Sequence, residues 1–139
     1  MMRMLIVDDD PAWRALYRMA FDSHFEIFEA IDGQQGLETL DAVDPDVIVL
    51  DLRMPRMDGL DFIRRLGSRG IRGSIVVCSG ALNEGERPTL PGIQLAPKSP
   101  DLRDLWAALC TAKPGLTEAT VMNKRAAAAP EEDNNFWRD

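Results

Sequence analysis

Residues 47–50 read Val-Ile-Val-Leu, and the chain continues directly into Asp51. Four consecutive branched apolar residues are typical of a strand that is buried on both faces, as strands are in a parallel sheet. A charge is costly inside such a strand, so we expect Asp51 to lie just past its end. Open α/β sheets gather their ligand chemistry at that carboxyl edge. We therefore expect the fold to be organised around Asp51.

Short apolar segments and amphipathic segments alternate along most of the chain. The predicted strands are residues 3–7, 25–30, 47–50, 74–78 and 93–95. The predicted helices begin at the capping residues Asp10, Asp32, Asp58 and Ser99, with Pro11 and Pro100 at the first helical positions of the first and last. Strands that alternate with helices form βαβ units, and hence a parallel sheet covered on both faces. The predicted fold class is α/β, a flavodoxin-like, doubly wound sheet of five parallel strands.

Two stretches depart from this alternation. Residues 80–92 contain three glycines and two prolines without clear apolar periodicity, so we expect the fourth helix to be shortened or replaced by a loop. The composition changes after Lys113-Pro114-Gly115, and the remaining residues are too few for a second domain. We expect one domain over residues 1–112 and a flexible tail over residues 113–139.

Composition argues against several classes of protein. A net charge of −7 disfavours a general nucleic-acid binder, which would present a basic face. No apolar run approaches the ~20 residues that span a bilayer, and the N-terminal apolar segment reaches Asp8 too soon for a signal peptide. Cys78 and Cys110 lack metal-ligand spacing and lie in apolar contexts, so buried free thiols are expected. We expect a cytoplasmic protein without direct contact to nucleic acid or membrane.

Polar side chains of particular types follow the predicted strands. Asp8 and Asp9 follow the first, Asp51 the third, Ser79 the fourth and Lys98 the fifth. In a doubly wound sheet the first and third strands are neighbours, so the three aspartates converge. Carboxylates packed together repel one another, whereas Mg²⁺ binds well to one or two carboxylates, waters and phosphate oxygens. A carboxylate in that setting can attack phosphorus and form an aspartyl phosphate.

Four motifs carry the most specific signal in the chain. They are Val7-Asp8-Asp9-Asp10-Pro11, Asp51-Leu52-Arg53-Met54-Pro55-Arg56-Met57-Asp58-Gly59, Ser79-Gly80 and Lys98. Together they resemble the receiver domain of two-component response regulators, of the single-domain type, and the likeness covers residues 3 to about 112. The D-x-x-M-P-x-M-D-G string is highly specific, and it stands about 40 residues after the acidic pair.

The resemblance implies a role in phosphoryl transfer for three residues. Asp51 would accept a phosphoryl group from the phosphohistidine of a sensor histidine kinase or a histidine phosphotransferase. Ser79 would be the switch hydroxyl, and Lys98 would bind the phosphate.

The resemblance also implies Mg²⁺ as the cofactor. Asp9 and Asp51 would bind the ion directly, together with the backbone carbonyl of Arg53. Asp8 would bind it through water.

The sequence departs from the family pattern around the lysine. Receivers usually carry an aromatic switch residue three positions before it, where this chain has Leu95. They usually have proline directly after it, joined by a cis bond, where this chain has Ser99. A cis bond to a non-proline residue costs ~3 kcal/mol, so we expect either a trans bond or a strained site. With residues 80–92 also altered, the site chemistry is expected to be intact and the readout to be unusual.

Three classes of function compete. The leading hypothesis is a phosphoacceptor signalling module without an output domain, which passes its signal to an unknown downstream protein by contact. It would not be an enzyme beyond self-phosphorylation from small donors and slow autodephosphorylation. A phosphatase of the haloacid dehalogenase type would need an aspartate two residues after the nucleophile, where Arg53 stands. A degenerate receiver that binds a partner without phosphorylation is the remaining alternative.

Overall fold

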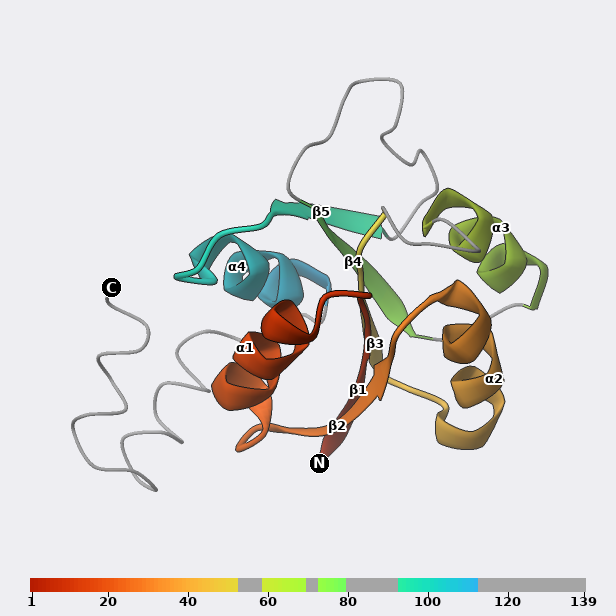
Figure 1. Ribbon diagram of the computed structural model, residues 1–139, viewed down its shortest axis with the longest axis horizontal. Helices are drawn as coiled ribbons and strands as arrows, with labels where there is room; N and C mark the ends of the chain where they lie inside the picture. The colour runs from red at the N-terminus through yellow and green to blue at the C-terminus, as the bar shows by residue number, and fades with distance from the viewer. Residues whose placement is uncertain (53–58, 70–72, 80–92, 113–139) are drawn as a thin grey trace.

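The computed structural model describes residues 1–52, 59–69, 73–79 and 93–112, which form a sheet and the helices on its two faces (Figure 1). The strands are β1 (Met2–Val7), β2 (Phe25–Ala30), β3 (Val47–Leu50), β4 (Ser74–Ser79) and β5 (Ile93–Pro97). The helices are α1 (Pro11–Phe21), α2 (Gly33–Val43), α3 (Gly59–Arg69) and α4 (Arg103–Ala112).

The strands form one parallel sheet in the order β2-β1-β3-β4-β5. The chain therefore winds outwards from β1 in one direction to β2 and in the other to β5, which confirms the doubly wound α/β prediction. Because β1 and β3 are neighbours, with Val7 opposite Leu50, the residues that follow these two strands emerge side by side.

The sheet separates two apolar layers, and the side chains of successive residues in one strand point into opposite layers. Met4 and Ile6 of β1 pack with α1 and α4, whereas Leu5 and Val7 pack with α2 and α3. Residues 47–50 are at most 2% exposed, with Val47 and Val49 in one layer and Ile48 and Leu50 in the other. The apolar strand before Asp51 is thus buried on both faces, as its sequence predicts.

Helix α1 begins as predicted, and its start is tied to the sheet. The Asp10 carboxylate accepts a hydrogen bond from the backbone N–H of Ala12 at 2.9 Å, and Pro11 occupies the first turn. Arg14 bonds the Asp8 carbonyl at 2.7 Å and pairs with Glu29 of β2 at 3.2 Å. These contacts fix the loop that carries the acidic pair against β2.

Helix α4 corrects the prediction for its first turn. Ser99 and Pro100 do not begin the helix, which starts at Arg103. The Ser99 hydroxyl bonds the Asp101 carboxylate at 3.1 Å, and that carboxylate accepts the backbone N–H of Arg103 at 3.0 Å. Leu102 has a φ of 60°, which is outside the right-handed helical region, so the helix begins only after this residue. The side chain that accepts the N–H of the first helical residue is therefore that of Asp101 and not that of Ser99.

Several predictions concern residues outside the described ranges. These are the cap at Asp58, the loop over residues 80–92 and the tail over residues 113–139. Within the ranges that the structure describes, no helix has the length and hydropathy needed to cross a membrane.

Candidate functional site

Backbone hydrogen bonds place Asp8 and Asp51 together at the carboxyl edge of the sheet. The N–H of Asp8 donates to the carbonyl of Ala30 at 3.1 Å, and the N–H of Asp51 donates to the carbonyl of Val7 at 3.0 Å. Each aspartate therefore continues the ladder one residue past its own strand. Both side chains are buried, with Asp8 1% and Asp51 7% exposed.

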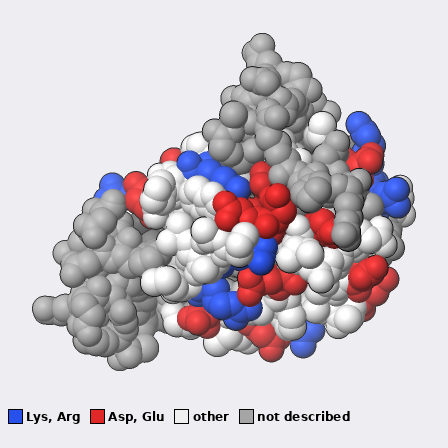
Figure 2. Space-filling view, in the orientation of Figure 1, with Lys and Arg blue, Asp and Glu red and all other residues white. Residues whose placement is uncertain are grey.

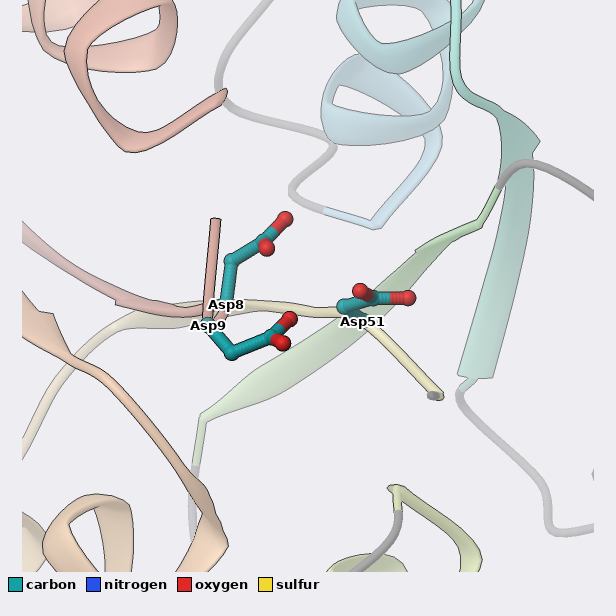
Figure 3. Close-up of side chains that lie close together, drawn as sticks. All are labelled: Asp8, Asp9 and Asp51. Carbon is teal, nitrogen blue, oxygen red and sulfur yellow. The ribbon is translucent and has the colours of Figure 1, made fainter. Parts of the chain in front are cut away.

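Asp8, Asp9 and Asp51 form one acidic cluster. Each offers a carboxylate oxygen, and these three oxygens lie within 4.8 Å of one another. Figure 3 shows the three side chains directed into the same space beyond the ends of β1 and β3. Asp9 is exposed, and Figure 2 shows acidic atoms gathered at the centre of this face of the molecule. The convergence predicted from the strand order is confirmed.

Lys98 brings a positive charge into the cluster from directly after β5. Its Nζ lies 2.9 Å from Oδ2 of Asp8 and 3.2 Å from Oδ2 of Asp51. The lysine side chain is only 10% exposed, so these ion pairs are shielded from bulk water. Since β4 separates β3 from β5 in the sheet, the lysine spans the end of β4 to reach the two carboxylates.

The pKa shifts of these groups follow from burial and from the ion pairs. Burial raises the pKa of Asp8, although hydrogen bonds from the Asp10 N–H and from Lys98 act against it. For Lys98, burial acts to lower the pKa, but the hydrogen bond to Asp8 and the charges of Asp51 and Asp8 together raise it. The lysine is therefore held in its charged form, while the buried aspartate would be stabilised by further positive charge.

The cluster has the donor set that a hard divalent cation requires. Three carboxylates supply oxygen ligands, one of them exposed to water, and Mg²⁺ characteristically retains waters beside one or two carboxylates. Because burial raises the pKa of Asp8, a cation beside this carboxylate would stabilise the charged form that burial disfavours. The residues present thus fit Mg²⁺.

Of the predicted site residues, Ser79 is placed only in part and Arg53 is not described. Ser79 is the last residue of β4, where it pairs with Pro97 of β5, and the position of its side chain is outside the described structure. Arg53 also lies outside the described ranges. Of the residues at which the sequence departs from the family pattern, Leu95 is half-buried in β5 against the layer with α2 and α3. The Lys98–Ser99 bond is trans, as are all peptide bonds in the described ranges.

Trp13 makes a contact at the site that the sequence did not indicate. Its place on an apolar stripe, near the first turn after Asp9, predicts core packing close to the acidic pair, and the half-buried side chain does pack in the core. Its ring also faces Lys98, whose Nζ lies 5.1 Å from the ring centroid. The signal available in the sequence was the position of Trp13 in the first turn after the acidic pair, which places it at the same edge of the sheet.

A second contact lies beneath Trp13. Its ring packs on Tyr17, one turn along α1, with ring centroids 5.9 Å apart. The Tyr17 hydroxyl donates to Sγ of Cys78 in β4 at 3.3 Å. Burial is the largest cause that raises the pKa of both groups, that of Cys78 to about 11. Cys78 and Cys110 are both free, as predicted, although Cys110 is only half-buried.

The chain is thus a doubly wound α/β protein with two buried aspartates, an exposed third aspartate and a lysine at the carboxyl edge of its parallel sheet. The chain belongs to the response regulator receiver domain family, whose model matches residues 4–90.

Two relatives and one solved structure illustrate the similarity. The chain is 38% identical to the protein-glutamate methylesterase/protein-glutamine glutaminase of Treponema denticola over 96 residues, which are 67% of this chain and 26% of that protein. It is 33% identical to the chemotaxis protein CheY of Listeria monocytogenes over 87 residues, 61% of this chain and 73% of the relative. The crystal structure of the N-terminal domain of an uncharacterized Wolinella succinogenes protein superposes with a TM-score of 0.71 at 28% identity, covering 82% of this chain and 95% of that one.

The chain spans about a quarter of the length of the methylesterases that it matches. The similarity therefore concerns only a part of each of those proteins.

Proposed function

We propose that this chain is a phosphoacceptor of a two-component system or phosphorelay, with Asp51 as the residue that becomes phosphorylated. The observation that carries the proposal is the setting of the Asp51 carboxylate. It is 7% exposed, bonded to Lys98 at 3.2 Å, and within 4.8 Å of carboxylate oxygens of Asp8 and Asp9. A nucleophile held beside fixed charges is the arrangement that phosphoryl transfer requires.

In the proposed transfer, a carboxylate oxygen of Asp51 attacks the phosphorus of a phosphohistidine. A phosphorus–oxygen bond forms, the phosphorus–nitrogen bond breaks, and the imidazole leaves with the electron pair. The Lys98 ammonium lies where it can pair with an oxygen of the incoming group. Asp8, Asp9 and Asp51 would hold Mg²⁺, with the Arg53 carbonyl, and the ion would supply positive charge to the phosphoryl oxygens.

The proposed partners follow from the same chemistry. The donor is a sensor histidine kinase or a histidine phosphotransferase, and the output is contact with a downstream protein. We propose that the chain acts as a stoichiometric acceptor, with self-phosphorylation from small donors and slow autodephosphorylation as its only chemistry. The methylesterase activity in the names of some relatives is not part of this proposal.

The test is labelling by a radioactive small phosphodonor with Mg²⁺ and with chelator. We expect label on the wild type in the presence of Mg²⁺ and none on Asp51→Asn. The matched control is Asp41→Asn, a carboxylate on α2, which should label like the wild type. Label that persists in Asp51→Asn would contradict the assignment. A wild type that takes no label from any donor, yet captures a partner equally well with and without beryllofluoride, would favour the degenerate receiver.

A further inference from the structure

We propose that Trp13 is the positioning residue for Lys98: its ring holds the ammonium group against Asp8 and Asp51 in readiness for the phosphoryl group. This inference rests on the proposed function, because it assigns a device to the same site. The observation behind it is the 5.1 Å separation of Nζ from the ring centroid, which is within the range of a cation–π contact.

The ammonium group of Lys98 is enclosed by three side chains of two kinds. The Asp8 and Asp51 carboxylates lie 2.9 and 3.2 Å from Nζ, and the Trp13 ring lies against it as well. Trp13 follows β1, whereas Lys98 follows β5, so the contact joins the two sides of the site. Because the lysine side chain is only 10% exposed, little water is available to replace the ring.

A cation–π contact restrains a lysine side chain in a way that its ion pairs do not. Its charge is a compact point on a flexible stem, so the ion pairs restrain Nζ without restraining the stem. An ammonium group has three N–H donors, and a carboxylate accepts them at defined positions. The ring attracts the charge through its face without demanding one hydrogen-bond direction. Nζ can therefore turn from a carboxylate oxygen of Asp51 to an oxygen of the phosphoryl group without losing the ring.

The Trp13 ring is itself held in place. It packs on Tyr17, whose ring is 1% exposed and whose hydroxyl bonds Sγ of Cys78 at 3.3 Å. It also packs against the apolar layer between the sheet, α1 and α4. A ring fixed on one side by the core can restrain a flexible side chain on the other. Trp13 thus differs from an exposed aromatic residue beside a lysine, because packing holds its ring in place.

The experiment measures the initial rate of labelling by a small phosphodonor at fixed Mg²⁺. Trp13→Leu removes the aromatic face and keeps an apolar side chain. We expect the rate to fall roughly fivefold, which corresponds to the loss of a cation–π contact of about 1 kcal/mol. Trp13→Phe keeps an aromatic face and should restore most of the rate. Trp106→Leu truncates a tryptophan of α4 that stacks on Phe21, and should leave the rate unchanged in the folded protein.

A double-mutant cycle separates positioning from packing. In a Lys98→Met background, which retains much of the lysine stem, Trp13→Leu should cause no further loss of rate. Wild-type rate in Trp13→Leu, or an equal loss with and without Lys98, would overturn the proposal. If Asp51→Asn shows that the proposed function is wrong, the same four proteins are compared by urea unfolding. Additive effects of the two substitutions on stability would then refute the contact, and non-additive effects would support it.

Discussion

A β-carbon added at Gly36 would lie 2.8 Å from Cε1 of Phe62 and 3.3 Å from Cγ2 of Val7. Helices α2 and α3 therefore contact each other where α2 has no side chain. The Phe62 ring is fully buried and cannot swing into solvent to make room. The glycine, unfavourable by its helix propensity, is explained by this packing.

Replacement of Gly36 by alanine should destabilise the protein. The substitution gains up to about 1 kcal/mol of helix propensity but forces a buried ring to move, which costs about 1–3 kcal/mol. We expect a net decrease in the free energy of unfolding, measured by urea denaturation. Gly67→Ala is the matched control, since a β-carbon there meets nothing within 4 Å and should leave stability unchanged or raise it. An equal effect of both substitutions would contradict the packing explanation.

Mg²⁺ should change the fluorescence of Trp13. The ring contacts Lys98, and both carboxylates that pair with this lysine are proposed ligands of the ion. The measurement uses a Trp106→Phe/Trp137→Phe variant, in which Trp13 is the remaining tryptophan. We expect a saturable change in emission that is weakened by Asp9→Asn. Emission that stays constant over a titration in which calorimetry detects Mg²⁺ binding would refute this coupling.

Alkaline pH should weaken the fold through Cys78. Burial raises the pKa of this thiol from 9.0 to about 11, so the folded state keeps its proton over a range in which the unfolded state loses it. Its contribution to stability is fully present below the unfolded pKa and is lost as pH rises towards the folded value. Between about pH 8 and about pH 10 we expect a loss of about 1 kcal/mol in the free energy of unfolding.

The comparison for this prediction is Cys78→Ala, measured by urea denaturation across the same range. The variant should be less stable than the wild type near pH 8, because Tyr17 loses its acceptor and a cavity is left. Its stability should then fall less steeply with pH. Parallel slopes for the two proteins would show that another group causes the effect.

Loss of the lysine should make stability depend on divalent cations. Without Lys98, the buried carboxylates of Asp8 and Asp51 lose their positive partner, and Lys98→Met should lower the free energy of unfolding in chelator by about 1–3 kcal/mol. Saturating Mg²⁺ should reduce the difference from the wild type. A deficit that is the same in chelator and in Mg²⁺ would show that the ion does not neutralise the carboxylates with which Lys98 pairs.

The fold and the acidic cluster could be predicted because short-range signals determine them. Four branched residues before Asp51 indicate a buried strand, and the alternation with helices indicates a parallel sheet covered on both faces. In a doubly wound sheet the first and third strands are neighbours. Once β1 and β3 are neighbours, the carboxylates must meet. No finer information was needed for that step.

The start of α4 and the role of Trp13 could not be predicted in the same way. Ser99-Pro100 has the composition of a helix start, but the Asp101 carboxylate takes both the serine hydroxyl and the Arg103 N–H. Whether Ser99 or Asp101 accepts the first N–H of the helix depends on the backbone conformation between them, which the sequence pattern does not specify. The ring of Trp13 meets Lys98 through a long-range contact between α1 and the end of β5. An apolar stripe along the helix predicts that Trp13 is buried, but it does not indicate which side chain lies over the face of its ring.

The position of β4 between β3 and β5 has a consequence for how the chain acquires its site. All three clustered aspartates lie within the first 51 residues, and Lys98 comes 47 residues after the last of them. Pairing of β1, β2 and β3 alone would bring the acidic groups together without the ammonium group of Lys98. The residue that pairs with Asp8 and Asp51 reaches them only once β5 has joined the far edge of the sheet.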